Sequence, residues 1–420
     1  MPHTNLRRLI GGFVLIFFLS GCTTGSFAPV PTQPSPPTPT SAAPQDAKVF
    51  PSSTPTSAAF ILQPTFTPFS TATVFSIDGM TGTSYGPSSF PAGINPLTGL
   101  VVEKPELLER RPMVIKVTNF PRQVRPQWGL SLADHIFEYY LEDGMTRFVG
   151  IFYSQEANRV GPVRSARPFD YHLVKMYKAI FAFGYADKKV WNPLKASDIA
   201  DYLVIERPGN CPPMCRIGPD SDYNTLFTDT GQLSKYISDR GVDNSRQNLD
   251  GLRFSDYPLQ GGGQVSEVLI RFSSTSHHKW EYNAARNTYL RSQETAGNPI
   301  GQEVYEPLYD NLTKRWLWAD NLVILLVPTG FYYESNSTEI YEIQLEGTGP
   351  GYALRDGKIF EVLWSRPTPE SLVTVTFPNG NLFPLRPGNV WFEVLSDKTV
   401  IETTASGIWR FYFDLPEGTK

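Results

Sequence analysis

Hydrophobic residues recur with two different periods between residues 93 and 255. A continuous apolar run over residues 113–119 predicts a buried strand. Asp143-Gly144 follows a second apolar run and predicts a tight hairpin turn, because both of its positions need a positive φ. A further strand is expected over residues 179–185, and helices over 130–134, 169–178, 196–203 and 232–239. This mixture predicts a mixed α/β sheet domain over residues 93–255.

The second half of the chain has shorter apolar segments and more turn signals. Gly261-Gly262-Gly263 marks a boundary, and Asp356-Gly357 and Asn379-Gly380 mark turns. Strands are expected over residues 265–272, 279–282, 288–291, 321–327, 339–344, 359–364, 371–377 and 390–395. Frequent short strands are typical of a sandwich or a barrel-like module. The expected fold class is therefore α+β, with the mixed domain followed by a mostly β domain over residues 256–418.

The first 21 residues have the pattern of a secretion signal. Arg7 and Arg8 precede an apolar run over residues 9–18, which is too short for a good membrane span. The run ends in Leu19-Ser20-Gly21-Cys22, which resembles the lipobox of bacterial lipoproteins. This pattern predicts removal of residues 1–21, acylation of Cys22 (palmitate included) and anchoring to the bilayer on the extracytoplasmic face of the cell membrane. A plain signal peptide or a short anchor, with a chance cysteine, is the alternative.

A stalk is predicted over residues 22–92. Residues 29–91 contain 13 prolines, and the only charged residues between 23 and 92 are Asp46, Lys48 and Asp78. Such a segment cannot bury a core and favours disorder with extended polyproline II stretches. Fully extended at about 3.1 Å per residue, it would reach up to ~200 Å. The stalk is therefore interpreted as a spacer between membrane and folded body.

Composition limits the class of protein. The formal charge is −4, and loss of Arg7 and Arg8 with the signal leaves −6, so a nucleic-acid coat is not expected. Hydrophobic residues make up 40% of the chain and aromatics 13%, which is enough for folded cores. The common nucleophile and zinc-protease motifs are missing, so no catalytic residue, metal or cofactor is assigned. The six tryptophans of residues 256–418 are interpreted as core residues in preference to sugar-binding platforms.

Cys211 and Cys215 enclose the segment Cys-Pro-Pro-Met-Cys. Outside the cytoplasm a disulfide between them is expected, because lipid consumes Cys22 and leaves an even pair. Free thiols, or a redox or metal role, are the alternatives. Two sulfurs alone do not complete a zinc site.

Residues 93–418 resemble the YerB-like family of bacterial lipoproteins, whose N- and C-terminal domains form domain of unknown function 3048. The residues that carry the resemblance are Arg111-Pro112-Met113-Val114, Asn119, residues 125–130, residues 133–138, residues 142–148, residues 161–168 (Gly-Pro-Val-Arg-Ser-Ala-Arg-Pro), residues 318–323 and Gly347-Thr348-Gly349. The resemblance implies a two-domain, membrane-anchored extracytoplasmic protein. It supplies no catalytic residues, because the function of the family is unknown.

Arginines of the blocks that carry this resemblance are the candidate ligand-binding residues. The set is Arg125, Arg147, Arg164 and Arg167, together with Asn119. Arginine binds carboxylate or phosphate groups through two parallel hydrogen bonds, so this set could hold an anion. In the competing interpretation, the arginines pair with nearby acids, among them Asp134, Glu138, Glu142 and Asp143, and only fix the loops.

The function expected is that of a non-catalytic binding or scaffold protein of the cell envelope. Its partner would be an envelope protein or an anionic wall polymer. The alternative is a cell-wall-modifying, glycan hydrolase-like enzyme that uses acids such as Glu138 and Glu142, which would share one face of a strand. A transporter's substrate-binding protein is less expected, because such proteins have two similar α/β lobes.

Overall fold

The computed structural model describes residues 73–415, apart from 78–79, 220 and 405. The predicted signal peptide, Cys22 and most of the predicted stalk lie outside the described residues. The described residues all belong to one compact unit, which contains the described parts of both predicted domains. The boundary between these domains near residue 255 stays a prediction.

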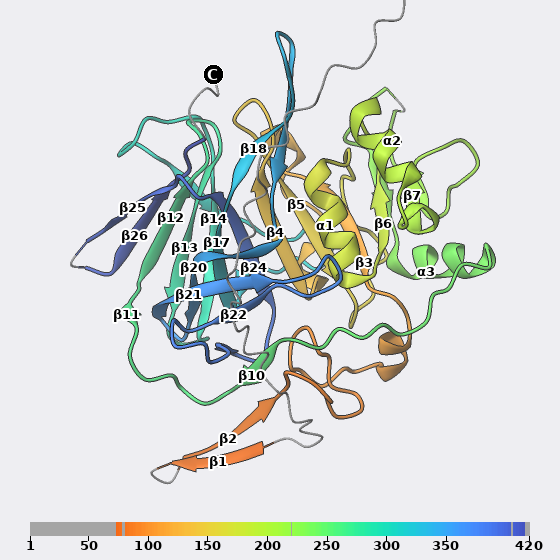
Figure 1. Cartoon of the computed structure of the whole chain (residues 1–420). Helices are drawn as coiled ribbons and strands as arrows, with labels where there is room; N and C mark the ends of the chain where they lie inside the picture. The colour runs from red at the N-terminus through yellow and green to blue at the C-terminus, as the bar shows by residue number, and fades with distance from the viewer. Residues whose placement is uncertain (1–72, 78–79, 220, 405, 416–420) are drawn as a thin grey trace, which may run out of the picture. The chain divides into compact units, whose positions relative to one another are not determined.

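The largest sheet has 11 strands and takes strands from both halves of the chain. The first half supplies β3 (Met113–Thr118), β4 (His135–Tyr140), β5 (Thr146–Phe152), β6 (Ile180–Phe183) and β7 (Leu203–Ile205). The second half supplies β11 (Gly263–Gln264), β17 (Asn321–Val327), β20 (Gly347–Arg355), β21 (Lys358–Arg366), β22 (Thr374–Thr376) and β24 (Val390–Ser396). The main order is β11-β21-β20-β17-β24-β4-β5-β3-β6-β7, and β22 pairs with β21. The halves meet where β4 runs parallel to β24 (Figure 1).

A second sheet comes from the second half alone. Its strands are β12 (Glu267–Arg271), β13 (His277–Asn283), β14 (Thr288–Glu294), β15 (Tyr305–Pro307), β16 (Trp318–Ala319), β25 (Val400–Thr403) and β26 (Ile408–Tyr412). Two further hairpins are β8 (Met214–Arg216) with β9 (Leu226–Thr228), and β18 (Thr329–Ser335) with β19 (Thr338–Ile343).

A four-stranded sheet lies in part within the predicted stalk. It joins β1 (Thr73–Ile77), β2 (Met80–Tyr85), β10 (Arg253–Ser255) and β23 (Pro384–Leu385). The prediction of disorder up to residue 92 is therefore corrected at its end. Proline is sparse between residues 69 and 86, and Phe254 of β10 lies opposite Tyr85. Pairing with a strand far along the chain orders this segment, and the local composition does not predict it.

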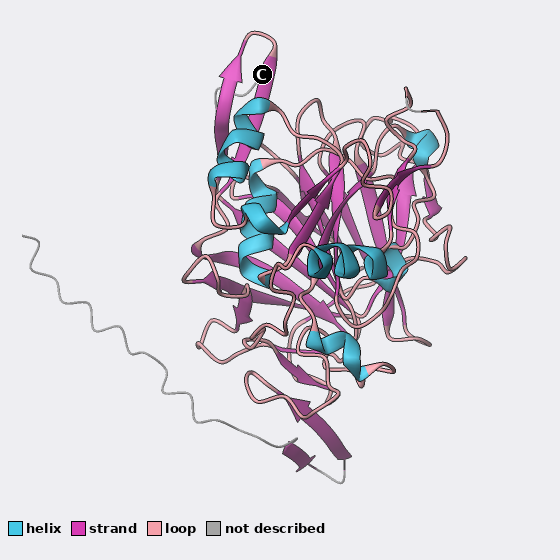
Figure 2. Ribbon diagram, turned by 90° about the vertical axis from the view of Figure 1, so that its right-hand side faces the viewer, coloured by secondary structure: helices cyan, strands magenta, loops and turns pink. Residues whose placement is uncertain are grey.

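The body is mostly β, with a few helices (Figure 2). The α-helices are α1 (Pro168–Tyr177), α2 (Lys188–Ala196) and α3 (Thr230–Asp239), and the 3₁₀ helices are η1 (Pro105–Glu109), η2 (Arg122–Val124), η3 (Leu130–Leu132) and η4 (Ala200–Tyr202). The helices predicted at 169–178 and 232–239 correspond to α1 and α3. The helix predicted at 196–203 is wrong, because α2 ends at Ala196 and only the short η4 follows.

Alternation along the strands gives the large sheet two buried faces. Phe137 and Tyr139 of β4 belong to the core that contains Phe169 of α1. Ile136 of β4 belongs to the other core, which contains Trp280 of the second sheet. Helix α1 therefore packs on one face of the large sheet, while the second sheet packs on the opposite face, toward which Glu138 points.

The predicted hairpin turn joins β4 to β5. Asp143 has a φ of 55° and Gly144 a φ of 71°, as the turn requires. The Ser273 hydroxyl, from the second half of the chain, donates a hydrogen bond to the Gly144 carbonyl at 2.6 Å. A Cβ at Gly144 would lie 2.9 Å from the Ser273 Oγ, so glycine is also needed for this close approach.

Candidate functional site

Residues 161–167 run in extended form beside the second half of β3 and the end of β6. The Arg164 amide donates to the Lys116 carbonyl at 3.0 Å, and the Gly184 amide donates to the Arg164 carbonyl at 3.0 Å. The Ala166 amide donates to the Tyr185 carbonyl at 2.7 Å. These backbone bonds fix the segment between two strands and hold Arg164 beside the open end of β6.

Arg164 lines an open pocket of about 640 Å³, which we call the Arg164 pocket. Its lining residues are Val163, Arg164, Ser165, Gly184, Tyr185, Glu206, Arg207, Pro208, Gly209, Cys211, Met214, Arg216, Tyr223 and Leu226. Three arginines and one glutamate line it, so the pocket carries an excess of positive charge. Tyr185 and Tyr223 are 62% and 72% exposed as whole residues, so they offer apolar surface beside the arginines.

Arg164 forms no ion pair with an acid of the described residues, although the charge of Asp222 acts on it from a greater distance. Its buried Nε has no hydrogen-bond partner in the described part of the chain. Burial lowers the pKa of Arg164, and the like charge of Arg167 lowers it further. Arg147 is held close to Arg164, because its Nη1 donates to the carbonyl of Ser165, the residue that follows Arg164 in the chain, at 2.9 Å. Burial, and then Arg167, lower the Arg147 pKa to about 9.

Arg167, the third arginine of this group, is paired with a nearby acid. Its Nε donates to the Glu142 carboxylate at 3.0 Å, and its Nη2 forms an ion pair with the same group. The Arg167 backbone amide also donates to the Asp170 carboxylate at 2.8 Å, at the beginning of α1. Arg167 is thus held by acids and Arg147 by a backbone carbonyl of the loop, whereas Arg164 forms no ion pair among the described residues.

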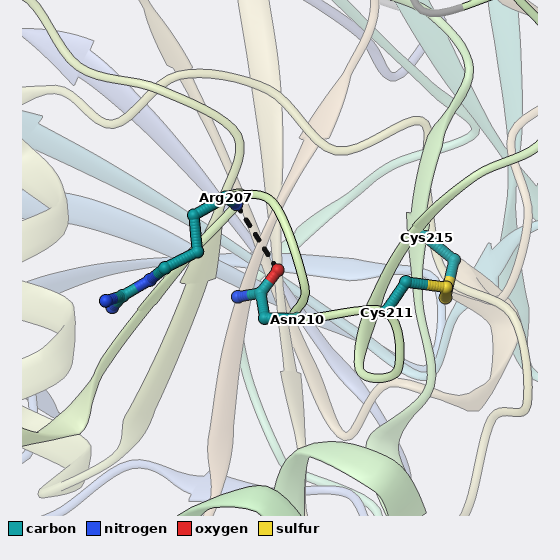
Figure 3. The surroundings of a disulfide bond; sticks show 4 residues. All are labelled: Arg207, Asn210, Cys211 and Cys215. Carbon is teal, nitrogen blue, oxygen red and sulfur yellow. Dashed lines mark hydrogen bonds between the residues drawn. A yellow bond between two sulfur atoms is a disulfide. The ribbon is translucent and has the colours of Figure 1, made fainter.

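The Arg164 pocket is also lined by a loop closed by the predicted disulfide between Cys211 and Cys215 (Figure 3). The Arg207 amide donates to the Asn210 side chain at 3.3 Å, and the Arg207 side chain extends away from the sulfur bridge. Arg216 pairs with Glu206 at 2.5 Å. The sequence analysis did not select Arg207, Arg216 or Tyr223. Their position on either side of the cysteine pair is the signal that would have indicated them.

Arg125 and Asn119 lie in a different, buried place. Arg125 makes a two-pronged ion pair with Glu294 of β14, with nitrogen–oxygen distances of 3.0 and 3.1 Å. The Asn119 amide donates to Thr146 Oγ1 at 2.9 Å and to Glu138 Oε1 at 3.3 Å. The structure therefore separates these two residues from the Arg164 pocket and places them in the contact between the two halves.

Glu138, His278 and Glu393 form the one group of acids and histidine among the described residues whose ligand atoms lie within 4.8 Å of one another. All three are fully buried. Arg291 already occupies the position of a cation, since its Nη2 lies 2.6 Å from Glu138 and its Nη1 3.2 Å from Glu393. Burial raises the Glu393 pKa to about 7. The donor set thus fits an internal arginine better than a metal ion.

Two models of known protein domains match the chain, one in each half. The N-terminal domain of DUF3048, described as a protein of unknown function, matches residues 97–243, and its C-terminal domain matches residues 268–392. The chain belongs to the DUF3048 family. The resemblance stated from the sequence is thereby confirmed, and each match lies inside one of the predicted domains.

A similar protein, YerB of Bacillus subtilis, is matched both by sequence and by its crystal structure. Over 310 residues the chain is 26% identical to "Putative lipoprotein YerB" of strain 168, which covers 72% of this chain and 86% of the relative. The crystal structure of the YerB protein has a TM-score of 0.61 at 23% identity and covers 72% of this chain and 96% of that one. The similarity to the YerB crystal structure shows that this chain has the same fold. Within the described residues, no helix is long and apolar enough to span a bilayer.

Proposed function

We propose that this DUF3048 protein is a non-catalytic binding lipoprotein of the cell envelope, anchored by acylated Cys22 on the extracytoplasmic face of the membrane. Its folded body holds a phosphate or carboxylate group of an envelope polymer or partner protein in the Arg164 pocket. The anchor rests on the lipobox of residues 19–22 and on the lipoprotein name of the Bacillus relative.

The charge of Arg164 carries the proposal. A partly buried cation that has no ion-pair partner among the described residues costs free energy, and an anionic ligand would offset that cost. The Arg164 guanidinium can donate two parallel hydrogen bonds to a phosphate or carboxylate. Arg207, which also lines the pocket, adds a second cation, while Tyr185 and Tyr223 can contact the carbon skeleton next to the anion. This combination of a few polar groups with apolar walls is typical of ligand pockets.

Both acids predicted for the enzyme alternative are paired with arginines. Glu138 is 0% exposed and is held by Arg291, Asn119 and Thr146, so its carboxylate does not reach a substrate. Glu142 is bound to Arg167. Two carboxylates that flank a sugar bond are therefore not provided by this pair.

A direct titration tests the anion site. The full chain, purified in mild detergent, is titrated with polyphosphate and, separately, with poly-glutamate, so that phosphate and carboxylate are distinguished. Arg164→Ala is expected to weaken binding of at least one polymer tenfold or more, and Arg164→Lys to keep part of it, because lysine retains the charge but not the two-pronged geometry. Arg246→Ala, which removes an exposed arginine paired with Glu109, is the matched control. Equal affinities of Arg164→Ala and the unmodified chain would contradict the proposal.

Incubation with purified sacculi separates the two functions. A binder is expected to pellet with the sacculi and to release no wall fragments. Release that disappears in Glu142→Gln would favour the enzyme alternative instead.

A further inference from the structure

The tryptophans of the second half are not all core residues. Trp280, Trp364 and Trp391 are at most 1% exposed, as expected from the sequence. Trp316 is 50% exposed, and it is the only tryptophan among the exposed large hydrophobic residues of the described chain. It lines a pocket of about 180 Å³, on residues that the Arg164 pocket does not share.

Two tryptophans reach this second pocket because of strand alternation. Trp316 and Trp318 both line it, and Leu317 between them is 2% exposed and belongs to the core. Extended chain places side chains two apart on the same side, so burying Leu317 turns both indoles toward the pocket. The Arg286 guanidinium lies 5.4 Å from the centre of the Trp318 ring and covers part of it. Trp316 therefore has more uncovered ring surface than Trp318, and we call its exposed indole the platform.

The platform is held in place before any ligand arrives. Trp316 lies opposite Tyr309 in an antiparallel bridge, and the two rings meet edge to face with centroids 5.7 Å apart. Between them, the buried Asp310 carboxylate accepts hydrogen bonds from the amides of Gly129 at 2.9 Å, Ser131 at 2.7 Å and Leu312 at 2.7 Å. A preorganised aromatic surface loses little conformational entropy on binding.

Polar groups surround the aromatic pair. Gln155 and Arg315 are exposed and line the pocket, and neither forms a side-chain hydrogen bond or ion pair with the rest of the described chain. Ser131 and Asn389 also line it. An amide and a guanidinium beside an indole face match a sugar ring, which presents hydroxyls at its rim and C–H groups on its flat side.

We propose that this pocket is a saccharide subsite in which Trp316 stacks against one β-linked hexose or N-acetylhexosamine unit of a glycan chain, while Gln155 and Arg315 bind its hydroxyl or acetamido groups. β-Linked units of this kind carry their substituents around the ring edge and leave a flat apolar face. The volume of about 180 Å³ lies below the ~300 Å³ at which drug-sized pockets begin, so one ring fits and the glycan continues outside. This site is separate from the Arg164 pocket.

Saturation-transfer NMR and tryptophan fluorescence with two probes test the subsite. The probes are the β-1,4-linked tetramers of N-acetylglucosamine and of glucose, added to the full chain in detergent. Binding of at least one tetramer is expected, with affinity reduced at least tenfold in Trp316→Ala and several-fold in Gln155→Ala. Tyr333→Ala removes an exposed aromatic of β18 outside the pocket and should leave affinity unchanged, as should Arg164→Ala.

Two results would overturn the subsite. One is absence of binding of both tetramers to the unmodified chain. The other is equal affinity in Trp316→Ala, with melting curves showing that the variant is folded. Because Arg164→Ala reports on the anion pocket alone, failure of one site is distinguishable from failure of the other.

Discussion

Glu138 of β4 and Glu393 of β24 lie directly side by side on neighbouring parallel strands, and both are fully buried. Two adjacent buried carboxylates repel each other unless a cation lies between them. Arg291 of β14 supplies that cation from the opposing sheet, with its guanidinium also within about 5.3 Å of the Phe148, Trp280 and Trp391 rings. One arginine thereby links both halves of the large sheet to the second sheet.

Removing this arginine is expected to destabilise the whole body. Arg291→Met would leave two buried carboxylates without their cation, for which a loss of about 3–5 kcal/mol is typical. Glu138→Gln should cost less, because the amide still accepts a hydrogen bond. Urea denaturation measures both losses. Lys235→Ala, which breaks an exposed pair with Asp239, is the control and should change stability by less than ~0.5 kcal/mol. An Arg291→Met protein within 1 kcal/mol of the unmodified chain would refute this role.

His135 makes stability depend on pH. It is buried on β4, where Nδ1 bonds to the Tyr177 hydroxyl at 2.6 Å and Nε2 donates to the Leu97 carbonyl at 2.7 Å. Burial lowers its pKa from 6.5 to about 4, so between these values the unfolded chain binds more protons than the folded one. Its contribution to stability is complete above pH 6.5 and is lost as the pH falls toward 4, by roughly 3 kcal/mol at most.

The His135→Gln variant isolates this effect. Comparing unfolding free energies of both proteins at pH 7 and pH 4.5 cancels the other groups that titrate in this range, such as Glu393. The variant is expected to be less stable at pH 7, with a difference that shrinks at pH 4.5. A difference that stays constant with pH would show that His135 has an ordinary pKa in the folded state.

How far the sequence predicts the fold depends on the range of the determining interaction. The strand at 113–119, the Asp143-Gly144 turn and helix α1 follow from local pattern and were predicted. Helix α2 was not, because Pro193 lies inside it and Asp187, whose side chain accepts from the Lys189 amide at 2.8 Å, begins it after an unremarkable loop. The hairpin β1–β2 was not predicted for a different reason. It is ordered by pairing with β10, which lies far along the chain.

The candidate site shows the same limit. The block at 161–168 led to Arg164 and Arg167, but the sequence does not tell which arginine has an acid partner. Arg125 pairs with Glu294, 169 residues away, and Arg291 with Glu138, 153 residues away. Sheet packing selects those partners, so spacing along the chain carries no signal for them. The exposed Trp316 likewise differs from its buried neighbours only through tertiary packing.

The disulfide is expected to shape the Arg164 pocket more than it stabilises the fold. A loop this short restricts the unfolded chain little, so Cys211→Ala with Cys215→Ala should lower stability by roughly 2 kcal/mol or less. Since Cys211 lines the pocket beside Arg207, the loosened loop should weaken polyphosphate or poly-glutamate binding several-fold. Thermal melting and the same titration measure the two effects. Unchanged binding in the double variant would place the loop outside the site.

Asp310 is expected to control the position of Trp316 without touching a ligand. It is 1% exposed, and its carboxylate receives the amides of Gly129, Ser131 and Leu312. Asp310→Ala would leave these donors without an acceptor, at a cost of about 1–3 kcal/mol for each one that stays buried, and would free the turn that carries the indole. Asp310→Asn keeps one acceptor oxygen and should have an intermediate effect. Higher mobility of Trp316 would appear as lower fluorescence anisotropy, which Trp316→Phe in the same background assigns to this residue. A rigid Trp316 in Asp310→Ala would mean that the Tyr309 contact alone orders the platform.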